Sequence, residues 1–420
     1  MTQKIKEFWT EAFPTVWAWV HWSFLAVLTG LVCGAAGAAF SHAISLVTAW
    51  RGQQPWLLWC MPLAGLMIVW LYRVCGMEND SGTNQIIASV RSGQRPPLRL
   101  APLIFIGSVL THLTGGSAGR EGAALQIGGS LACQVGQRFH LGEREMNVAV
   151  MCGMSGLFAA LFGTPLTASV FAMEVVSVGI VHYSAFFPCL LTALVSVGVT
   201  VLLGVEGEHY VLHAVPTLEA ISLVQIGVLG VGCALLAMAF CVVVHQTGHW
   251  YSRYLPNPYL RAVVGGVLVV AVSLIEGSGD YNGAGGPIIA QAIEGTVDVP
   301  WAFALKLLLT ALTLGAGYRG GEIVPTFFVG ATFGCAVAPL LGVDPGFGAA
   351  VCMIALFCGV VNCPLASIFL SVELFGGEGL LFFALACALS YLLSGTFSLY
   401  SSQKIVYSKL EPRFIDENAH

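Results

Sequence analysis

Charge is the scarcest feature of this 420-residue sequence. Lys, Arg, Asp and Glu together make up only 9% of it, against 57% hydrophobic residues, and the mean hydropathy is +0.82. Soluble domains carry roughly 25% charged residues. The composition therefore excludes an ordinary soluble protein and indicates a polytopic membrane protein.

Long polar intervals are also scarce. The longest, around 76–99 and 403–420, are too short to form a soluble domain, so we expect one transmembrane domain over residues 1–420. Several apolar stretches approach or exceed the roughly 20 residues that cross a bilayer as a helix, whereas the strands of a transmembrane barrel are alternating segments of about ten. These stretches predict helical spans, the clearest being 15–40, 54–74, 221–245 and 379–397.

Other familiar signals are missing. No small-residue cleavage site follows an apolar region of signal-peptide length, so we expect the N-terminus to be retained. The 13 cysteines form no CxxC pair, which favours small buried hydrophobic residues over disulfides or a metal site. The sequence has no basic tail that would indicate a nucleic-acid partner. We therefore expect no metal, no cofactor and no nucleic acid.

Basic residues recur in the short connections between apolar stretches. By the positive-inside rule these connections share the cytoplasmic side with Lys4 and Lys6. We therefore expect a multi-pass protein of the cell inner (plasma) membrane, with both termini in the cytoplasm, including a short tail over 401–420. The basic residues behind this expectation are Arg91, Arg95, Arg99, Arg138, Arg144, Lys404, Lys409 and Arg413.

The chain contains an internal repeat. PLTASVFAMEV at 165–175 matches PLASIFLSVEL at 364–374, and GREGAALQIGG at 119–129 matches GGEIVPTFFVG at 320–330. A third pair, DSGTNQIIASV at 80–90 and NGAGGPIIAQAI from Asn282, has nearly the same offset. The matches divide the chain into halves of roughly 15–204 and 215–400. Repeated halves, parallel or inverted, are typical of transporter folds with a site at the interface of the halves.

All three repeated elements are short apolar segments opened by glycine or proline, so they predict broken helices rather than full spans. The amides of a helix's first turn lack intrahelical partners and carry about half a unit of positive charge. Glycine lets an anion approach the main chain closely. We therefore expect Ser81-Gly82, Gly119–Gly122 and Gly320–Ile323 to form an anion cradle that needs no formal cation and can still release the ion.

Over nearly the whole chain, these motifs resemble the signatures of the CLC family of chloride channels and anion/proton antiporters. GSAGREGA resembles the family's GxxGREGP, GGEIVP stands where the family has GxFxP, DSGTN stands where it has GSGIP, and LYSS at 399–402 resembles its tyrosine motif. The resemblance implies an all-α polytopic membrane protein with two inverted repeats of broken helices and one pore per subunit. It also implies a homodimer in the lipid bilayer.

The resemblance implies roles for individual residues as well. In the family the anion is held by the serine of the first motif, by amides of the third and by the tyrosine hydroxyl, which here are Ser81, the amides of Glu322 and Ile323, and Tyr400. The glutamate of GREG is an extracellular gate that competes with the anion and carries protons, a role that falls to Glu121. Further candidates on the anion path are Thr83, Asn84, Gly119, Arg120 and Gly122.

Physical reasoning supports the role of Glu121 independently. Helix N-termini stabilise its carboxylate when it is charged, and an anion that takes its place favours protonation through like-charge repulsion. Anion occupancy and proton affinity are then linked, which is the requirement for exchange. The plainer alternative is that an acidic residue merely favours a helix N-terminus, but an ionisable group in a membrane segment favours function.

Departures from the common pattern point to one branch of the family. Val175 stands where chloride-type antiporters keep an intracellular proton-transfer glutamate, and Glu322 adds a carboxylate where they carry an apolar residue. With Thr83 and Asn84 altering the first motif, this combination resembles the fluoride-exporting branch, which exchanges fluoride for protons. A protonated Glu322 would replace the lost relay and offer fluoride a strong donor. Ser81 keeps the chloride-type residue, so a chloride/proton antiporter or a passive chloride channel of the same fold remains the alternative.

For two groups of acidic residues, a structural role is the simpler interpretation. Glu322 could pair with Arg319 or Arg120 across the halves, because buried carboxylates usually have partners. Glu174 and Glu373 are repeat-related, which favours a shared structural role at helix ends over proton transfer from Glu174.

The remaining candidates are weaker. Lys306 is expected to neutralise a neighbour or to snorkel, and Tyr400 could be only an interfacial aromatic. GSGD at 277–280 looks like a motif of intramembrane aspartyl proteases, which need two facing aspartates. Asp80 is the only other aspartate in a comparable repeat position, so we expect a transport protein and not an enzyme.

Overall fold

The computed structural model describes residues 2–411 and 413–420, and their side chains from Val16 onward. The first eight helices are α1 (Thr2–Gln53), α2 (Met61–Val74), α3 (Thr83–Ser92), α4 (Leu100–Leu113), α5 (Glu121–Arg138), α6 (Glu143–Phe162), α7 (Pro165–Glu174) and α8 (Phe186–Leu202). The second eight are α9 (Ala220–Tyr254), α10 (Pro258–Glu276), α11 (Gly286–Ile293), α12 (Ala302–Gly315), α13 (Ile323–Val337), α14 (Pro345–Val361), α15 (Pro364–Phe375) and α16 (Leu380–Leu393). Short 3-10 helices are Pro55–Cys60, Tyr183–Ala185 and Ala338–Leu341, and the strands are β1 (Ser177–Val178), β2 (Lys404–Tyr407) and β3 (Phe414–Asn418).

Seven helical segments of the described chain are long and apolar enough to cross a bilayer, which confirms the prediction of a multi-pass helical membrane protein. They are Val16–Gln53, Pro55–Val74, Glu143–Phe162, Tyr183–Leu202, Ala220–Tyr254, Pro258–Glu276 and Ile323–Leu341. Three of the four clearest apolar stretches lie in these segments. The fourth, 379–397, forms only the shorter α16, because the helix ends at Leu393 and the chain turns at Gly395 with φ of 58°.

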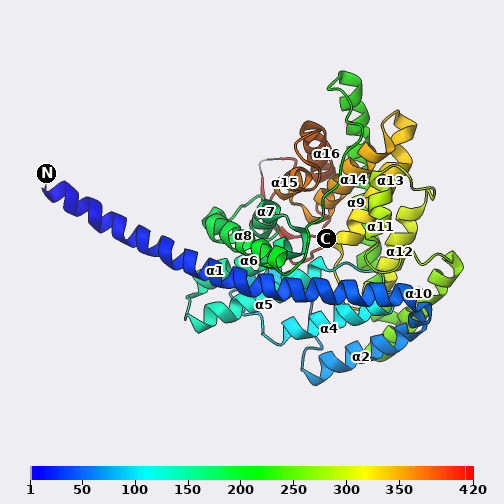
Figure 1. The fold of residues 1–420 in the computed structure, drawn as a ribbon, viewed down its shortest axis with the longest axis horizontal. Coiled ribbons are helices and arrows are strands. Elements are labelled where there is room, and N and C mark those ends of the chain that lie inside the picture. The colour runs from blue at the N-terminus through cyan, green and yellow to red at the C-terminus, as the bar shows by residue number, and fades with distance from the viewer. Residues whose placement is uncertain (1, 412) are drawn as a thin grey trace.

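The helices at the centre of the molecule pack most closely. Over their most apolar windows α6 is 83% buried and α13 is 72% buried, whereas α2 and α10 are each 33% buried and lie at the edge of the molecule (Figure 1). A Cβ on Gly128 of α5 would collide with the Gly153 carbonyl of α6, and a Cβ on Gly334 of α13 with the Gly348 carbonyl of α14. Small residues at crossings are the usual means by which membrane helices approach each other, so glycine sets the spacing of both central pairs.

The helices fall into two sets of eight on either side of a linker, residues 203–219. Two of the three repeated pairs form short helices as predicted: α3, α7, α11 and α15 are only 8 to 12 residues long. The third pair is longer than predicted, because α5 has 18 residues and α13 continues into a candidate span, Ile323–Leu341. Proline at the first position starts α7 and α15, where its missing N–H costs no hydrogen bond. Gly82 and Gly285, with φ of 64° and 84°, supply the left-handed backbone that leads into α3 and α11.

Glu174 and Glu373 each lie at the end of one short helix and bind the start of the other. The Glu174 carboxylate accepts hydrogen bonds from two first-turn amides of α15 at 3.2 and 2.9 Å. The Glu373 carboxylate accepts from two first-turn amides of α7 at 2.9 and 2.8 Å. Each cap joins the two repeats, and together the caps show the structural role at helix ends that the repeat predicts.

We expect Glu174→Ala and Glu373→Ala to destabilise the protein by similar amounts. Each change removes a charged cap and leaves two amides unsatisfied in an apolar setting, at a cost of about 2–4 kcal/mol in the free energy of unfolding. A lower melting temperature in detergent would show the loss, and Glu411→Ala, an exposed tail carboxylate, is the control that should melt like the wild type. Proton coupling lost in Glu174→Gln at an unchanged melting temperature would instead support the proton-transfer alternative.

The tail after α16 folds back onto the helices. Strand β2 pairs in parallel with β1 and antiparallel with β3, forming a small sheet beside the all-α membrane domain. Gln403 donates to the carbonyls of Val175 at 3.0 Å and Val361 at 2.8 Å, and Arg91 of α3 donates to the Ser402 carbonyl. The tail over 401–420 therefore packs against both repeats and fixes the position of Tyr400 just before it.

Lys306 of α12 neither neutralises an acidic neighbour nor snorkels, so that expectation was wrong. Its side chain is fully buried, and Nζ donates to the carbonyls of Tyr281 at 2.9 Å and Gly283 at 2.6 Å. The ring of Phe328 lies 5.0 Å from the ammonium. Carbonyl oxygens and an aromatic face replace a counter-ion, and Lys306 thereby anchors the loop that leads into α11.

Candidate functional site

The first turns of α5 and α13 meet at a short backbone bridge between the two repeats. The Gly119 amide donates to the Gly321 carbonyl at 2.7 Å, and the Gly321 amide donates to the Gly119 carbonyl at 2.8 Å. A Cβ on Gly321 would collide with the amide nitrogen of Gly122, so glycine is required for this approach. Two helix N-termini thus present their partial positive charge to one region.

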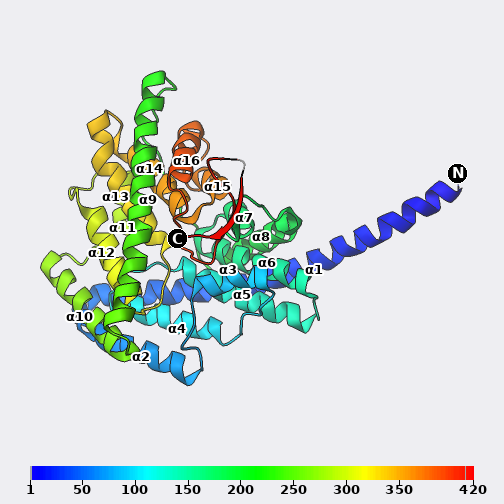
Figure 2. The same ribbon diagram turned by 180° about the vertical axis from the view of Figure 1, so that it is seen from behind.

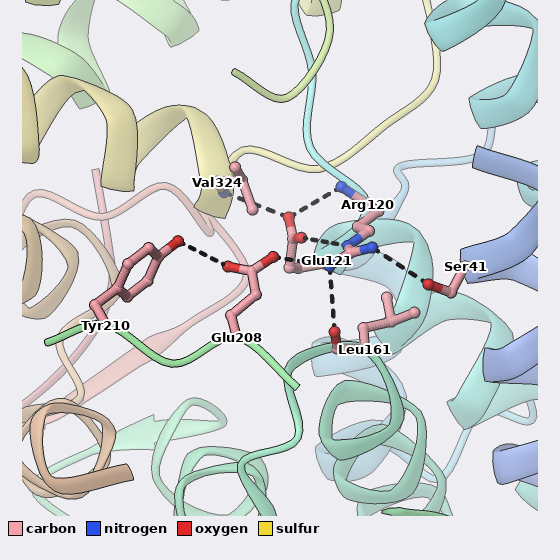
Figure 3. A network of polar contacts seen from close by, with 7 residues as sticks. All are labelled: Ser41, Arg120, Glu121, Leu161, Glu208, Tyr210 and Val324. Atoms are coloured by element: carbon pink, nitrogen blue, oxygen red, sulfur yellow. Dashed lines mark hydrogen bonds and ion pairs between the residues drawn. The ribbon is translucent and has the colours of Figure 1, made fainter. Parts of the chain in front are cut away.

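Glu121, the first residue of α5, is fully buried at this meeting point (Figure 3). Its Oε2 accepts hydrogen bonds from the Arg120 amide at 2.9 Å and from the Val324 amide, in the first turn of α13, at 3.3 Å. Its Oε1 lies 3.7 Å from Nε of Arg120. The carboxylate therefore occupies amide donors from both repeats.

The Arg120 side chain ties Glu121 to the linker between the repeats (Figure 3). Its guanidinium donates to Glu208 Oε1 at 2.9 Å, to the Leu161 carbonyl at 3.2 Å and to the Ser41 hydroxyl at 3.4 Å. Tyr210 donates to the other oxygen of Glu208 at 3.2 Å. Arg120 thus stands between a buried carboxylate and one whose side chain is 36% exposed.

A polar cavity of about 220 Å³, here called the vestibule, gathers residues from motifs far apart in the sequence. Five residues predicted for the anion path line it: Ser81, Thr83, Asn84, Glu322 and Tyr400. Asp80, Gly82, Gln126 and Arg319 complete its polar wall. The structure therefore brings the first motif, the GxFxP-like motif and the tyrosine motif to one place.

Three oxygen atoms of the vestibule's residues are buried and have no hydrogen-bond partner in the described chain: the Tyr400 hydroxyl, Glu322 Oε2 and Gln126 Oε1. Gly122 borders the same space, because a Cβ there would lie 3.0 Å from Thr83 Oγ1 and 3.2 Å from Glu322 Oε2. Unpaired buried polar atoms are costly unless water or a ligand meets them. The wall is therefore suited to a small polar ligand.

Hydrogen bonds across the repeats hold the first motif in place. Asp80 Oδ1 accepts from the Gly82 amide at 3.1 Å, and Asp80 Oδ2 pairs with Arg319 at 3.0 Å. The Asn84 side chain accepts from the Ser402 amide at 3.0 Å. Asn84 therefore positions the segment that carries Tyr400, in addition to lining the vestibule.

Three predicted anion-path residues, Gly119, Arg120 and Ile323, are not part of the vestibule's lining, and Gly122 borders the cavity without lining it. The Gly119 amide is used in the bridge between repeats, the Arg120 amide is held by Glu121, and the Arg120 guanidinium points toward Glu208. Two amides of the Gly119–Gly122 stretch therefore have partners within the protein, and the anion cradle stays a prediction. The sequence shows which amides lack partners within their own helix, but the other repeat supplies the partner of the Gly119 amide, and Glu121 supplies that of the Arg120 amide.

Sequence reasoning missed several residues of the site. Gln126 donates to Thr83 at 3.4 Å and to the Gly122 carbonyl at 3.1 Å, and a polar residue inside the apolar run GAALQIGG was the available signal. Arg319 was considered only as a partner for Glu322. Glu208, a linker carboxylate, carried no signal in the sequence, because nothing there places the linker beside Arg120.

Two alternative interpretations are excluded by the ion pairs. Glu322 pairs with neither arginine, since Arg319 pairs with Asp80 and Arg120 with Glu121 and Glu208. The two aspartates that a protease would need do not face each other, because Asp80 is held by Arg319 whereas Asp280 is exposed in the loop before α11.

A polytopic helical protein whose broken helices and hydroxyl donors surround a small polar cavity belongs to the class of membrane anion transporters and channels. Comparison with known proteins agrees. Residues 64–395 match the sequence model of a family described as voltage gated chloride channel. The chain is 37% identical over 395 residues to a chloride/fluoride channel protein of Pseudomonas syringae pv. tomato, covering 92% of this chain and 87% of that protein.

More distant relatives and a solved structure extend the likeness. The chain is 25% identical over 388 residues to the H+/Cl− exchange transporter ClcA of Vibrio vulnificus, covering 84% of this chain and 81% of that protein. The crystal structure of a CLC-type fluoride/proton antiporter superposes with a TM-score of 0.88 at 30% identity, covering 91% of this chain and 98% of that one.

This chain belongs to the CLC family of voltage-gated chloride channels and related antiporters. The resemblance drawn from its motifs is confirmed, and so is the predicted all-α polytopic fold of two repeats with broken helices. Members of the family are transporters or channels, so the protein is an anion transport protein and not an enzyme.

Proposed function

We propose that the protein exports fluoride in exchange for protons. The observation that carries this proposal is the presence of two carboxylates, Glu121 and Glu322, at the N-termini of two helices that meet between the repeats, with Glu322 Oε2 buried and unpaired beside the vestibule. The likeness to a fluoride/proton antiporter and to a chloride/fluoride channel protein supports the choice of ion.

Glu121 is the gate in this proposal. While it is charged, its carboxylate holds the Val324 and Arg120 amides and excludes an anion from them. An anion that enters from the vestibule competes for these donors, and repulsion between like charges then favours protonation of the displaced carboxylate. Each anion that passes is thereby linked to a proton that moves in the opposite direction.

Glu322 supplies the second proton site and the preference for fluoride. In its protonated form it offers an O–H donor to the vestibule, next to the unpaired Tyr400 hydroxyl. Fluoride is small and strongly hydrated, so it gains more than chloride from short, strong hydrogen bonds. Glu322 also takes the place of the relay glutamate whose position is held here by Val175, a fully buried apolar residue.

Chloride/proton exchange is the second candidate, because Ser81 retains the chloride-type residue at the vestibule. The test uses purified protein in liposomes, with anion efflux and external pH recorded together for fluoride and for chloride. Proton uptake driven by fluoride with little chloride flux is the expected result. Comparable chloride flux would move the assignment to a chloride transporter, and anion flux with no proton movement to a channel.

The assembly and orientation expected from the sequence belong to the same proposal. The protein is a homodimer with one anion path per subunit, in the cell inner membrane, with both termini in the cytoplasm. The exposed basic residues Arg95 and Arg99 lie in the connection before α4, as the positive-inside rule requires of a cytoplasmic segment. Cysteine labelling from either side of intact cells, and cross-linking in liposomes, test the two statements separately.

A further inference from the structure

A second cavity lies beside the vestibule, between α2 and α10. It has a volume of about 380 Å³, far more than a single halide ion fills. Its polar lining comes from Tyr72 and Arg73 at the end of α2, Glu78 and Asn79 after it, Arg261 near the start of α10, and Arg319 before α13. We refer to this cavity as the arginine pocket. Figure 2 shows α2 and α10 side by side at one edge of the molecule.

The arginine pocket has an excess of positive charge. Arg73 pairs with Glu78 at 3.2 Å, and both side chains are mostly exposed at the rim. Arg319 pairs with Asp80 at 3.0 Å. Arg261 forms no ion pair in the described chain and donates only to the Ser252 hydroxyl at 3.2 Å. One guanidinium is therefore left without a counter-charge in a chain that has few charges of any kind.

Three buried polar atoms of the arginine pocket's residues have no hydrogen-bond partner in the described chain: the Tyr72 hydroxyl, Arg261 Nε and Arg319 Nε. All three can donate, and the two guanidinium groups cannot accept. The guanidinium of Arg319 also lies over the Tyr72 ring at 3.9 Å, which fixes the spacing of these two donors. A ligand that satisfies the set must offer several acceptor oxygens at once, and arginine forks match oxyanions in geometry as well as in charge.

The arginine pocket and the vestibule share a wall. Arg319 lines both cavities, and its partner Asp80 lines the vestibule and binds the Gly82 amide at the start of α3. Asp80 offsets the charge of Arg319, so a negative group bound in the arginine pocket makes the potential of this shared wall more negative. That negative potential opposes the entry of a second anion into the vestibule.

We propose that the arginine pocket binds a phosphate group on Arg261, Arg319 and Tyr72, and that its occupancy slows the entry of the transported anion into the vestibule. The phosphate comes from one of two sources. The outer faces of α2 and α10 are apolar, with Leu63 and Val267 exposed, and the segments that contain these helices are long and apolar enough to cross a bilayer, which suits a phospholipid headgroup. Free phosphate from solution offers the same chemistry.

Binding is measured first, on purified full-length protein in detergent, by isothermal titration with three probes. These are inorganic phosphate, dioctanoyl phosphatidylglycerol and zwitterionic dioctanoyl phosphatidylcholine. We expect phosphate or phosphatidylglycerol to bind, and Arg261→Gln to bind that probe about tenfold more weakly, the loss expected for one charged hydrogen-bond donor. Arg253→Gln, an exposed arginine outside the pocket, should bind like the wild type.

Each outcome decides the proposal. Binding of inorganic phosphate identifies free oxyanion as a ligand, and binding of phosphatidylglycerol alone identifies the headgroup of an anionic lipid. Absence of binding by both, or unchanged affinity in Arg261→Gln for the probe that binds, overturns it. Equal binding of phosphatidylcholine, which also carries a phosphodiester, with loss of that binding in Arg261→Gln, identifies the phosphate group itself as the ligand without a need for net lipid charge. Because binding is measured without transport, its outcome is independent of which anion the protein carries.

The effect on transport is measured in liposomes with and without the probe that binds. We expect the probe to reduce anion efflux in the wild type and in Arg253→Gln, and to have a much smaller effect in Arg261→Gln. An equal reduction in Arg261→Gln would show that the pocket does not control entry into the vestibule. Arg261 lies outside the anion path, so this variant separates pocket occupancy from the transport machinery.

Discussion

Glu121→Gln is expected to carry anions without carrying protons. The amide of glutamine can still accept the hydrogen bonds that Glu121 receives from the Val324 and Arg120 amides, so the local structure is retained. An amide does not take up a proton in the physiological range, and it repels an incoming anion no more than a protonated carboxyl does. Proton flux measured with a pH electrode should therefore fall to the background of empty liposomes while fluoride efflux continues.

The matched control for this prediction is Glu208→Gln. Glu208 lies on the other side of Arg120 at 2.9 Å and is also a carboxylate in the same network, but it is partly exposed and belongs to the linker (Figure 3). We expect Glu208→Gln to keep the ratio of protons to anions. Proton coupling that survives in Glu121→Gln, or that disappears equally in both variants, would contradict the assignment of Glu121 as the gate.

Replacing Glu322 is expected to separate proton transfer from ion selectivity. Glu322→Gln keeps a hydrogen-bond donor in the vestibule but carries no proton, whereas Glu322→Ala removes both. Both variants should lose coupled proton movement. Only Glu322→Ala should also lose preference for fluoride over chloride, by about tenfold, since one strong hydrogen bond to a charged group contributes about 1.5–3 kcal/mol before compensation by water.

The measurement for Glu322 is the ratio of fluoride to chloride efflux, recorded with proton flux in the same liposomes. Glu219→Gln, an exposed carboxylate in the linker, is the control and should match the wild type in both. Normal coupling in both Glu322 variants would remove this residue from the proton route. A selectivity that is equal in Glu322→Gln and Glu322→Ala would show that the donor is not what distinguishes the two ions.

Much of the fold follows from local signals and from the repeat. Proline and glycine at the starts of short apolar segments predicted broken helices, and they do begin α3, α7, α11 and α15. The identical spacing of Pro165 and Glu174 with Pro364 and Glu373 indicated a shared role at helix ends. The structure adds that each glutamate caps the other repeat, which spacing within one segment does not reveal.

The sequence predicted which residues form the site better than it predicted the contacts between them. Five predicted residues line the vestibule, and each could be predicted because it belongs to a motif of the family: Ser81, Thr83, Asn84, Glu322 and Tyr400. Contacts between distant segments had no such signal. The pairing of Arg319 with Asp80, and the approach of Glu208 to Arg120, depend on how the two repeats and their linker pack together.

The reciprocal caps also impose an order on biogenesis. Glu373 follows α7 in the chain by nearly the whole second repeat, so α7 enters the membrane with its first-turn amides still without their partner. Exposed amides are costly in hydrocarbon, where no water replaces the missing acceptor. The first repeat therefore reaches its final packing only after α15 has been synthesised, and a chain that stops before Glu373 leaves the first-turn amides of α7 without their acceptor.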